Sequence, residues 1–284
     1  MRTIKKIHQA HYHPIADLET YSPLPSAHLS QVDPFIFLNH HGLQTYPPQN
    51  NGLPFGPHPH RGMETVTFII EGDIMHKDSG GHESIIGAGG IQWMTAGSGL
   101  IHAEVSSSEF KKTGGPLQIL QLWLNLPAKL KLTSPRYKGL QKDEITHFIM
   151  DHGQVEVQLI AGEWDGYQGS FETLSPIFLS RVDLKRTGTL SKNIPASENI
   201  FLYVVRGSVK INGKEIPNRN LIEFNNDEDL LQLEATEDTI LLFGHAQPFN
   251  EPMVAQGPFV MNTHEEIRQA YRDYQQGKFG YWDE

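Results

Sequence analysis

The chain has 284 residues, of which 38% are hydrophobic, and it carries 23 basic against 33 acidic side chains but no cysteine. The net charge of -10 disfavours direct binding to nucleic acid, and the lack of cysteine excludes disulfides and thiolate metal ligands. No apolar run is long enough to span a bilayer, and residues 1–19 do not resemble an export signal, so we expect a soluble, cytoplasmic protein of two domains.

Segments with alternating apolar residues, rich in Val, Ile, Leu, Phe, Trp and Thr, follow one another between glycines and prolines. This pattern predicts an all-β fold. The clearest predicted strands lie within residues 64–72, 89–94, 116–127, 155–164, 200–213 and 239–245.

One segment near the C-terminus has helical periodicity. Residues 262–280 begin with Thr263 in an N-cap position and Glu266 three residues later, which is a capping box. Ile267, Ala270, Tyr271 and Tyr274 would then follow one face, so we expect the helix to dock on a barrel.

The two halves of the chain resemble each other in outline. Residues 68–78 (FIIEGDIMHKD) and 203–213 (YVVRGSVKING) share an apolar pair, a charged residue and a glycine, while residues 125–144 lose the alternation and look like an interdomain linker. The sequence therefore predicts two tandem β-barrels: residues 1–133 as an N-terminal barrel, and residues 134–284 as a second barrel with the C-terminal helix.

Two pairs of metal-binding side chains have the same spacing. His58 and His60 are one residue apart, and so are His102 and Glu104. On a strand, residues i and i+2 point to the same face about 7 Å apart, and neighbouring strands lie roughly 4.8 Å apart. If the two segments pair, all four side chains converge on one point, where three imidazoles and a carboxylate suit a divalent iron, manganese, nickel, copper or zinc ion.

Glu64 is a rival for the carboxylate ligand. An extended strand from His60 would place it about 13 Å away, too far to share an ion unless the chain bends sharply at Gly62. We therefore favour Glu104 as the ligand and expect Glu64 to accept a hydrogen bond from an imidazole or to line the pocket.

These motifs resemble those of a known family. Gly52, His58-Pro59-His60 and Glu64 match the spacing of the first cupin motif, and the segment ending at His102 matches the second more loosely, with Gly97 at the usual proline position. More narrowly, the chain resembles the pirin family, and the blocks that carry this resemblance are DPFIFLNHHG, HPHRGMETVTF, GIQWMTAGSGLIHAE and QGPFVMNTHEEI.

The resemblance implies a bicupin fold, with two jelly-roll-like barrels of which only the first binds metal. It also implies His58, His60, His102 and Glu104 as ligands of one Fe(II) ion. The equivalent segment of the second barrel, NIPASEN, contains no histidine.

The function that the resemblance implies is a quercetin 2,3-dioxygenase-type oxidoreductase, which cleaves a flavonol or similar aromatic enol with O2. Glu104, besides binding the metal, would take the proton of the enol. The alternative is a non-catalytic, metal- or redox-sensing regulator that acts through protein partners, since one member of the family is a nuclear coregulator.

The remaining histidines and the pocket residues have simpler interpretations. We expect His11 and His13 to be surface residues, His40 and His41 to lie in a turn, and His76 and His82 to form hydrogen bonds within a hairpin. The residues expected to line the pocket are Phe55, Gln121 and Trp123.

Overall fold

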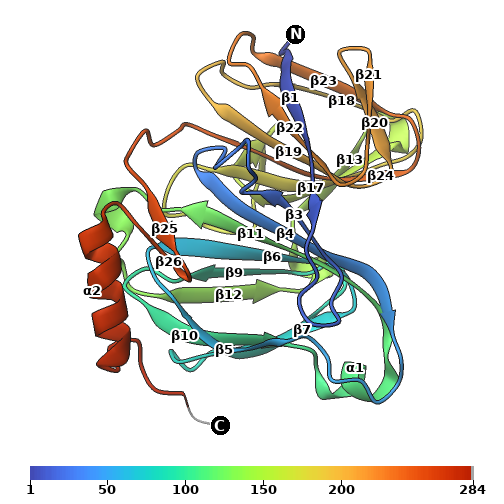
Figure 1. The fold of residues 1–284 in the computed structure, drawn as a ribbon. Coiled ribbons are helices and arrows are strands. Elements are labelled where there is room, and N and C mark those ends of the chain that lie inside the picture. The colour runs from blue at the N-terminus through green and yellow to red at the C-terminus, as the bar shows by residue number, and fades with distance from the viewer. Residues whose placement is uncertain (283–284) are drawn as a thin grey trace. The chain divides into compact units, whose positions relative to one another are not determined.

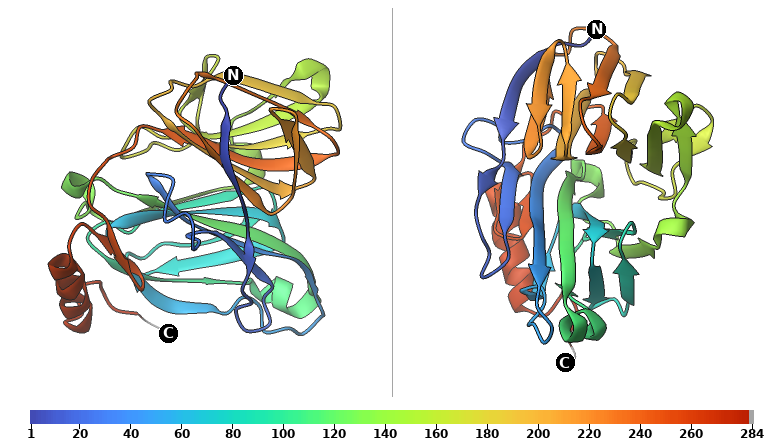
Figure 2. Two further views of the ribbon diagram at one scale, coloured as in Figure 1. Left: turned by 45° about the horizontal axis from the view of Figure 1, so that its top comes forward. Right: turned by 90° about the vertical axis from the view of Figure 1, so that its right-hand side faces the viewer.

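The computed structural model describes residues 1–282, which form two compact units. The unit that we call the first barrel comprises Tyr12–Thr20, Ile36–Asp143 and residues 249–282. The second barrel comprises Met1–His11, Tyr21–Phe35 and Glu144–Pro248. Both are built almost entirely from strands, as the sequence predicts, and Figures 1 and 2 show the strands gathered into sheets.

The first barrel is built on two large antiparallel sheets. In the larger sheet, strands of this unit have the order β12 (Arg136–Leu140), β9 (Ile91–Thr95), β6 (Met63–Glu71), β11 (Gly115–Asn125) and β4 (Phe35–Tyr46). The smaller sheet has the order β5 (Phe55–His60), β10 (Leu100–Val105), β7 (Asp73–Asp78) and β8 (Glu83–Gly87). Strand β10 therefore has β5 on one side and β7 on the other.

Apolar residues of both sheets meet inside the first barrel. Ile69 of β6 and Ile119 of β11 pack in one buried cluster with Ile74 of β7 and Ile86 of β8. The short helix α1 (Ser108–Thr113) adds the buried Phe110 to this cluster. The core holds the two sheets together and fixes the direction in which side chains of β5, β7 and β10 point.

The second barrel repeats this arrangement. Its larger sheet has the order β1 (Ile4–Gln9), β22 (Asn220–Phe224), β19 (Asn199–Arg206), β24 (Thr239–Ala246), β17 (Phe178–Leu184), β14 (Val155–Ala161) and β13 (His147–Met150). Its smaller sheet has the order β18 (Thr189–Asn193), β23 (Leu230–Ala235), β20 (Ser208–Ile211) and β21 (Lys214–Pro217). Valines, leucines and isoleucines of both sheets form a single buried core.

Short elements complete the chain. They are the strands β2 (His11–Tyr12), β3 (Thr20–Leu24), β15 (Glu163–Trp164), β16 (Tyr167–Gln168), β25 (Val254–Gln256) and β26 (Phe259–Met261), and the 3-10 turns Ala128–Leu130, Lys142–Glu144 and Asp151–Gly153.

The similarity between the two halves is confirmed at one turn of each barrel. Gly72 joins β6 to β7, and Gly207 joins β19 to β20, so each glycine lies where the chain leaves the larger sheet for the smaller one. Their φ angles are 84° and 76°, in the left-handed region that favours glycine. A Cβ atom at Gly207 would also lie 2.4 Å from the carbonyl oxygen of Asp238.

The predicted linker at residues 125–144 contains the boundary between the two units, at Asp143 and Glu144, but most of it is an ordered part of the first barrel. Its central part is strand β12, which pairs with β9 in the larger sheet of the first barrel. Lys131 in the same segment is 1% exposed and donates hydrogen bonds to the carbonyl oxygens of Gly62 and Val260. Pro, Lys and Gly collect here because β12 is an edge strand, where such residues are tolerated.

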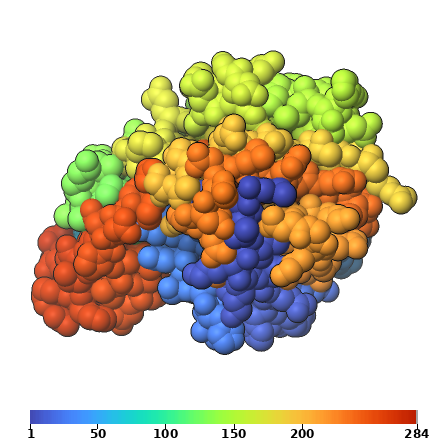
Figure 3. Space-filling view, turned by 90° about the horizontal axis from the view of Figure 1, so that it is seen from above, coloured from blue at the N-terminus to red at the C-terminus, as the bar shows by residue number. Residues whose placement is uncertain are grey.

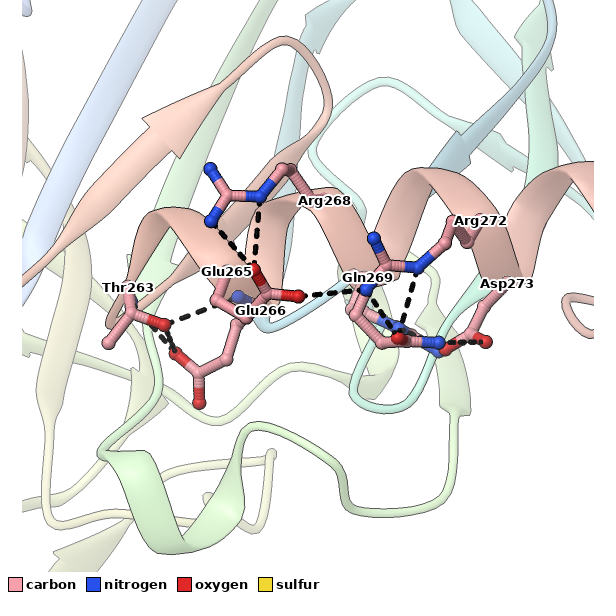
Figure 4. A network of polar contacts seen from close by, with 8 residues as sticks. Thr263, Glu265, Glu266, Arg268, Gln269, Arg272 and Asp273 are labelled. Carbon is pink, nitrogen blue, oxygen red and sulfur yellow. Dashed lines mark hydrogen bonds and ion pairs between the residues drawn. The ribbon is translucent and has the colours of Figure 1, made fainter.

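The C-terminal helix α2 (His264–Gln275) has the predicted capping box between Thr263 and Glu266. Ile267 and Ala270 are buried as predicted, but Tyr274 is exposed, and Asp273 is buried in its place because it pairs with Arg61. Figure 4 shows the polar network along the helix, and Figure 3 shows the C-terminal segment, in red, at the surface. No helix within residues 1–282 is both long and apolar enough to cross a bilayer.

The two units are not separated by a single boundary after residue 133, because each contains several segments of the chain. Strand β1 pairs with β22, so the N-terminal residues belong to the second barrel. Helix α2 packs on β25 and β26 and belongs to the first barrel, although the sequence interpretation grouped it with residues 134–284. The N-terminal strand thus belongs to the second barrel and the C-terminal helix to the first. Hydrophobic periodicity cannot reveal this, because it does not show which strands pair.

Candidate metal centre

The two segments with paired histidine and glutamate are neighbouring strands. His102 of β10 is directly opposite His58 of β5, and Leu100 is opposite His60. The register shifts between His102 and Glu104, where Phe55 becomes the partner. The segments that carry the two pairs of residues are therefore adjacent strands, as the sequence analysis required.

The three imidazoles of these strands face one another. The ring centroids of His58 and His102 are 4.4 Å apart, those of His60 and His102 are 5.0 Å apart, and those of His58 and His60 are 4.9 Å apart. One ligand atom from each of the three residues lies within 4.8 Å of the others. His60 and His102 are fully buried, and His58 is half-buried.

Hydrogen bonds fix the tautomers of two of these histidines. His58 donates from Nδ1 to the carbonyl oxygen of Gly56 at 2.7 Å, and His60 donates from Nδ1 to that of Pro258 at 3.1 Å. A carbonyl oxygen only accepts, so Nδ1 carries a proton in both rings, and in the neutral imidazole the lone pair is then on Nε2. His60 Nε2 is buried and has no hydrogen-bond partner within residues 1–282.

Burial keeps the imidazoles of His60 and His102 uncharged. It lowers the pKa of His60 to about 3, with a further contribution from His58, and it lowers the pKa of His102 well below its ordinary value. A metal ion requires the neutral imidazole as its ligand. The site therefore presents the protonation state that metal binding needs.

Glu104 is buried and firmly oriented. Its Oε1 accepts a 2.9 Å hydrogen bond from Thr67, and its Oε2 accepts one from the amide of Gln121. Gln121 in turn accepts a 3.2 Å hydrogen bond from the indole N–H of Trp123. Gln121 and Trp123 are two residues apart on β11, and together they hold the carboxylate in place.

The predicted quartet divides into two overlapping groups. One contains His58, His60 and His102, and the other contains Glu104, His102 and His76, whose ligand atoms also lie within 4.8 Å of one another. His102 belongs to both groups. The sequence interpretation placed His76 only in a hairpin and missed its proximity to the centre.

His76 is part of a second polar layer on β7. It donates from Nε2 to Asp78 at 3.0 Å, and its ring stacks on Tyr137 with centroids 3.9 Å apart. His82 contacts the same carboxylate at 3.1 Å, so the predicted hydrogen bonding of His76 and His82 within the hairpin is confirmed. Burial raises the pKa of Asp78, but hydrogen bonds from His76 and His82 outweigh it and hold the pKa at about 2.

Glu64 lies on β6, and within residues 1–282 no hydrogen bond joins it to an imidazole, which was one of the two roles expected for it. Its Oε1 accepts a 2.6 Å hydrogen bond from Thr95, its partner in β9. Burial raises the pKa of Glu64. The two candidate groups of ligands above do not include it.

Aromatic rings surround the centre. Trp123 lies edge-on to His60 with centroids 5.1 Å apart and stacks on Phe37 at 4.4 Å. Phe55, the half-buried first residue of β5, lies 5.2 Å from the ring of His41.

The predicted turn at His40 and His41 is wrong. Both residues are buried inside strand β4, where Gln118 donates to His40 and Thr20 shares a 2.8 Å hydrogen bond with His41. The sequence NHHG suggested a turn because Asn and Gly are common turn residues, but the strand continues through it. His11 and His13 are exposed, as expected.

The donor set fits a divalent transition-metal ion. The nitrogen atoms of His60 and His102 that lack partners are buried, and an unpaired buried polar group costs about 1–3 kcal/mol. Imidazole nitrogen with carboxylate oxygen suits iron, nickel, zinc and related ions. With these ligands alone, positions on an octahedral ion stay open for small molecules.

Comparisons with known proteins agree with this description. The family model for pirin matches residues 17–124, and the model for the pirin C-terminal cupin domain matches residues 179–280. A pirin-like protein of Solanum lycopersicum is 37% identical over 89% of this chain and 84% of its own length. A Pseudomonas aeruginosa protein that is provisionally named a quercetin 2,3-dioxygenase is 37% identical over 94% of this chain and 92% of its own.

Solved structures show the same fold. A crystal structure titled quercetin 2,3-dioxygenase from Acinetobacter baumannii superimposes with a TM-score of 0.92 at 33% identity and covers 99% of each chain. The Escherichia coli pirin YhhW in complex with nickel(II) has a TM-score of 0.69 at 23% identity, over 86% of this chain and 99% of its own. The fold consists of two cupin domains, and the chain belongs to the pirin family.

Proposed function

We propose that this protein is a metal-dependent dioxygenase that cleaves a flavonol, or a similar aromatic enol, with O2. We further propose Fe(II) as the metal and His58, His60, His102 and Glu104 as the residues that hold it. The observation that carries the proposal is the cluster of three imidazoles on the paired strands β5 and β10, together with the buried carboxylate of Glu104, which belongs with His102 to the second candidate ligand group. The 33% identity to a structure titled quercetin 2,3-dioxygenase supports the substrate class.

An ion held by these residues would supply Lewis-acid and redox chemistry, which would acidify an enol hydroxyl and favour the reaction of the substrate with O2. The overall reaction inserts both atoms of O2 into the flavonol, opens its central ring and releases carbon monoxide. The protein itself has to bind the planar substrate, orient it and accept one proton from its hydroxyl group.

Glu104 is the group that would accept this proton. Its carboxylate is held by Thr67 on one oxygen and by Gln121 on the other, so it loses no orientational freedom when the substrate arrives. The Trp123–Gln121 hydrogen bond restrains the amide that holds Glu104. This chain of hydrogen bonds is the preorganised part of the proposed base.

The aromatic rings beside the centre suit a flat polyphenol. Trp123 and Phe37 stack against each other next to His60, and Phe55 lies at the start of the strand that carries His58. Such rings contribute large contact areas at a low cost in side-chain entropy. We infer that they bind the substrate's fused rings and keep bulk water away from Glu104.

The test uses the full chain purified without oxygen. Metal analysis gives the identity and stoichiometry of the ion, and an oxygen electrode with a carbon monoxide trap measures turnover of quercetin. We expect one ion per chain and equal amounts of O2 consumed and carbon monoxide released. A protein with a full complement of metal that consumes no O2 with quercetin or related flavonols would contradict the enzyme proposal and favour the regulator.

A further inference from the structure

The four residues of the proposed centre differ in the hydrogen bonds that their side chains form with the rest of the protein. His58 and His60 each donate from Nδ1 to a main-chain carbonyl, and Glu104 accepts hydrogen bonds on both oxygens. His102 is the exception, because both of its ring nitrogens are buried and neither has a partner within residues 1–282. One nitrogen can bind an ion, but the other then needs an acceptor for its N–H group.

His76 lies on the side of His102 away from β5. Strand β7, which carries His76, pairs with β10 so that His76 is opposite Glu104 and Asp78 is opposite His102. The ring centroids of His76 and His102 are 5.5 Å apart, and a ligand atom of each lies within 4.8 Å of the other. A small side-chain rotation or one water molecule closes a gap of this size.

The orientation of His76 suits an acceptor. Its Nε2 faces the carboxylate of Asp78, which only accepts, so Nε2 carries a proton, and in the neutral ring the lone pair is on Nδ1. Asp78 is fixed by the main-chain N–H groups of Gly80 and His82. The stacking of His76 on Tyr137, with ring planes 8° apart, sets the direction of the imidazole.

We propose that His76 is a positioning residue of the metal centre, which accepts a hydrogen bond from His102 and thereby orients this ligand. Asp78 sets the tautomer of His76, so the order of action is Asp78, His76, His102 and then the ion. This inference rests on the proposed metal centre and adds an outer layer of ligand support from β7.

The test measures metal affinity, independently of turnover. The metal-free protein is titrated with Co²⁺, whose visible absorption reports both binding and ligand geometry. The variant His76→Phe keeps a ring that can stack on Tyr137 but loses both nitrogens. We expect its affinity for Co²⁺ to fall about 10- to 100-fold, with one ion per chain and the same number of ligands.

Two further variants test the order of action. In His76→Gln the amide offers both a donor for Asp78 and an acceptor for His102, so we expect part of the lost affinity to return. Asp78→Asn should weaken Co²⁺ binding as well. The double variant of His76→Phe and Asp78→Asn should be no weaker than His76→Phe alone, because the two residues act through one chain of hydrogen bonds.

His82→Gln is the matched control. His82 contacts the same Asp78 carboxylate, but its side chain is 46% exposed and it has no place in the candidate ligand groups. We expect its affinity for Co²⁺ to stay within about threefold of the wild type, as is usual for an exposed polar contact. Thermal unfolding of each metal-free variant checks that the fold is intact.

Two outcomes would overturn the inference. Wild-type affinity in a folded His76→Phe would mean that His102 needs no support from this side. A loss as complete as in His102→Ala, with an absorption change typical of a missing imidazole, would make His76 a ligand instead. Failure of the wild type to bind Co²⁺ would overturn the centre itself, whereas binding without quercetin turnover would contradict only the enzyme proposal.

Discussion

Arg61 donates a 2.8 Å hydrogen bond from Nη1 to Oδ2 of Asp273, and this ion pair joins the residue after His60 to helix α2. Both side chains are about nine-tenths buried, with exposures of 9% and 10%. Arg61 also donates from Nε to the carbonyl oxygen of Ser98 at 2.7 Å, just before β10. One guanidinium thus connects the ends of both ligand strands to the C-terminal helix.

Removing this pair should destabilise the first barrel. In Asp273→Asn the buried guanidinium loses its counterion, and we expect the free energy of unfolding at pH 7 to fall by about 2 kcal/mol. This is less than for a fully buried pair, because solvent still reaches a tenth of each side chain. Urea unfolding followed by fluorescence measures the change.

The effect should depend on pH. A hydrogen bond from Lys278, partly opposed by burial and joined by one from Arg61, holds the pKa of Asp273 well below its usual range. Stabilisation by a carboxylate with a lowered pKa is complete above its unfolded value near 4 and is lost as the pH falls toward the folded value. The difference between wild type and variant should therefore shrink below about pH 4. Glu265→Gln, which affects exposed pairs on the same helix, should change stability much less.

Lys131 should give a pH effect of the same sign in the alkaline range. Its ammonium donates to Gly62, Asn125 and Val260 at 2.6 to 3.0 Å, and burial lowers its pKa from 10.5 to about 8. Between these values the unfolded chain binds more protons than the folded one, so the folded state gains stability as the pH rises.

The comparison with Lys131→Met isolates this contribution. From pH 8 to pH 10 the wild type should gain about 1 kcal/mol per pH unit relative to the variant. Chemical unfolding at several pH values measures it. The exposed Lys129, replaced in Lys129→Met, provides the control, and an equal slope in both variants would contradict the interpretation.

The two candidate glutamates should separate in a metal-binding experiment. Glu104→Gln should lower metal affinity by more than about 100-fold, beyond the range for residues that only support a ligand. Glu64→Gln should retain the ion, because Glu64 pairs with Thr95 rather than with the histidines. Metal content after dialysis measures both, and equal losses would mean that Glu64 also binds the ion.

Gln121 should affect turnover more than metal content. Gln121→Leu removes the donor to Glu104 and the acceptor for Trp123 while keeping a similar volume. We expect kcat for quercetin to fall about 10- to 100-fold, as for loss of a group that orients a catalytic base, with one ion still bound. Unchanged kcat in the metal-loaded variant would show that Glu104 needs no such support.

The sequence predicted those features of the structure that are set by residues close together in the chain. Alternation found β6, β9, β11, β14, β19 and β24, the capping box found the start of α2, and the spacing of His58, His60, His102 and Glu104 led to two strands that do pair. Strand periodicity determines which face a side chain occupies, so residues two apart could be grouped without a structure.

The residues that were missed depend on distant segments. Lys131 is buried because its acceptors come from residues 62, 125 and 260, and Asp273 is buried because Arg61 reaches it. His76 approaches His102 only because β7 pairs with β10. A possible signal was present in the alternation of Ile74, His76 and Asp78, which places both polar residues on the inner face of β7.

The carbonyl of Pro258 that accepts from His60 lies almost two hundred positions further along the chain. During synthesis the ribosome therefore produces His58, His60, His102 and Glu104 long before it produces the group that fixes the His60 ring. A nascent polypeptide that ends before this proline contains the proposed ligands but lacks the carbonyl group that orients the His60 ring. Tight metal capture should accordingly come after translation, once the tail has folded back.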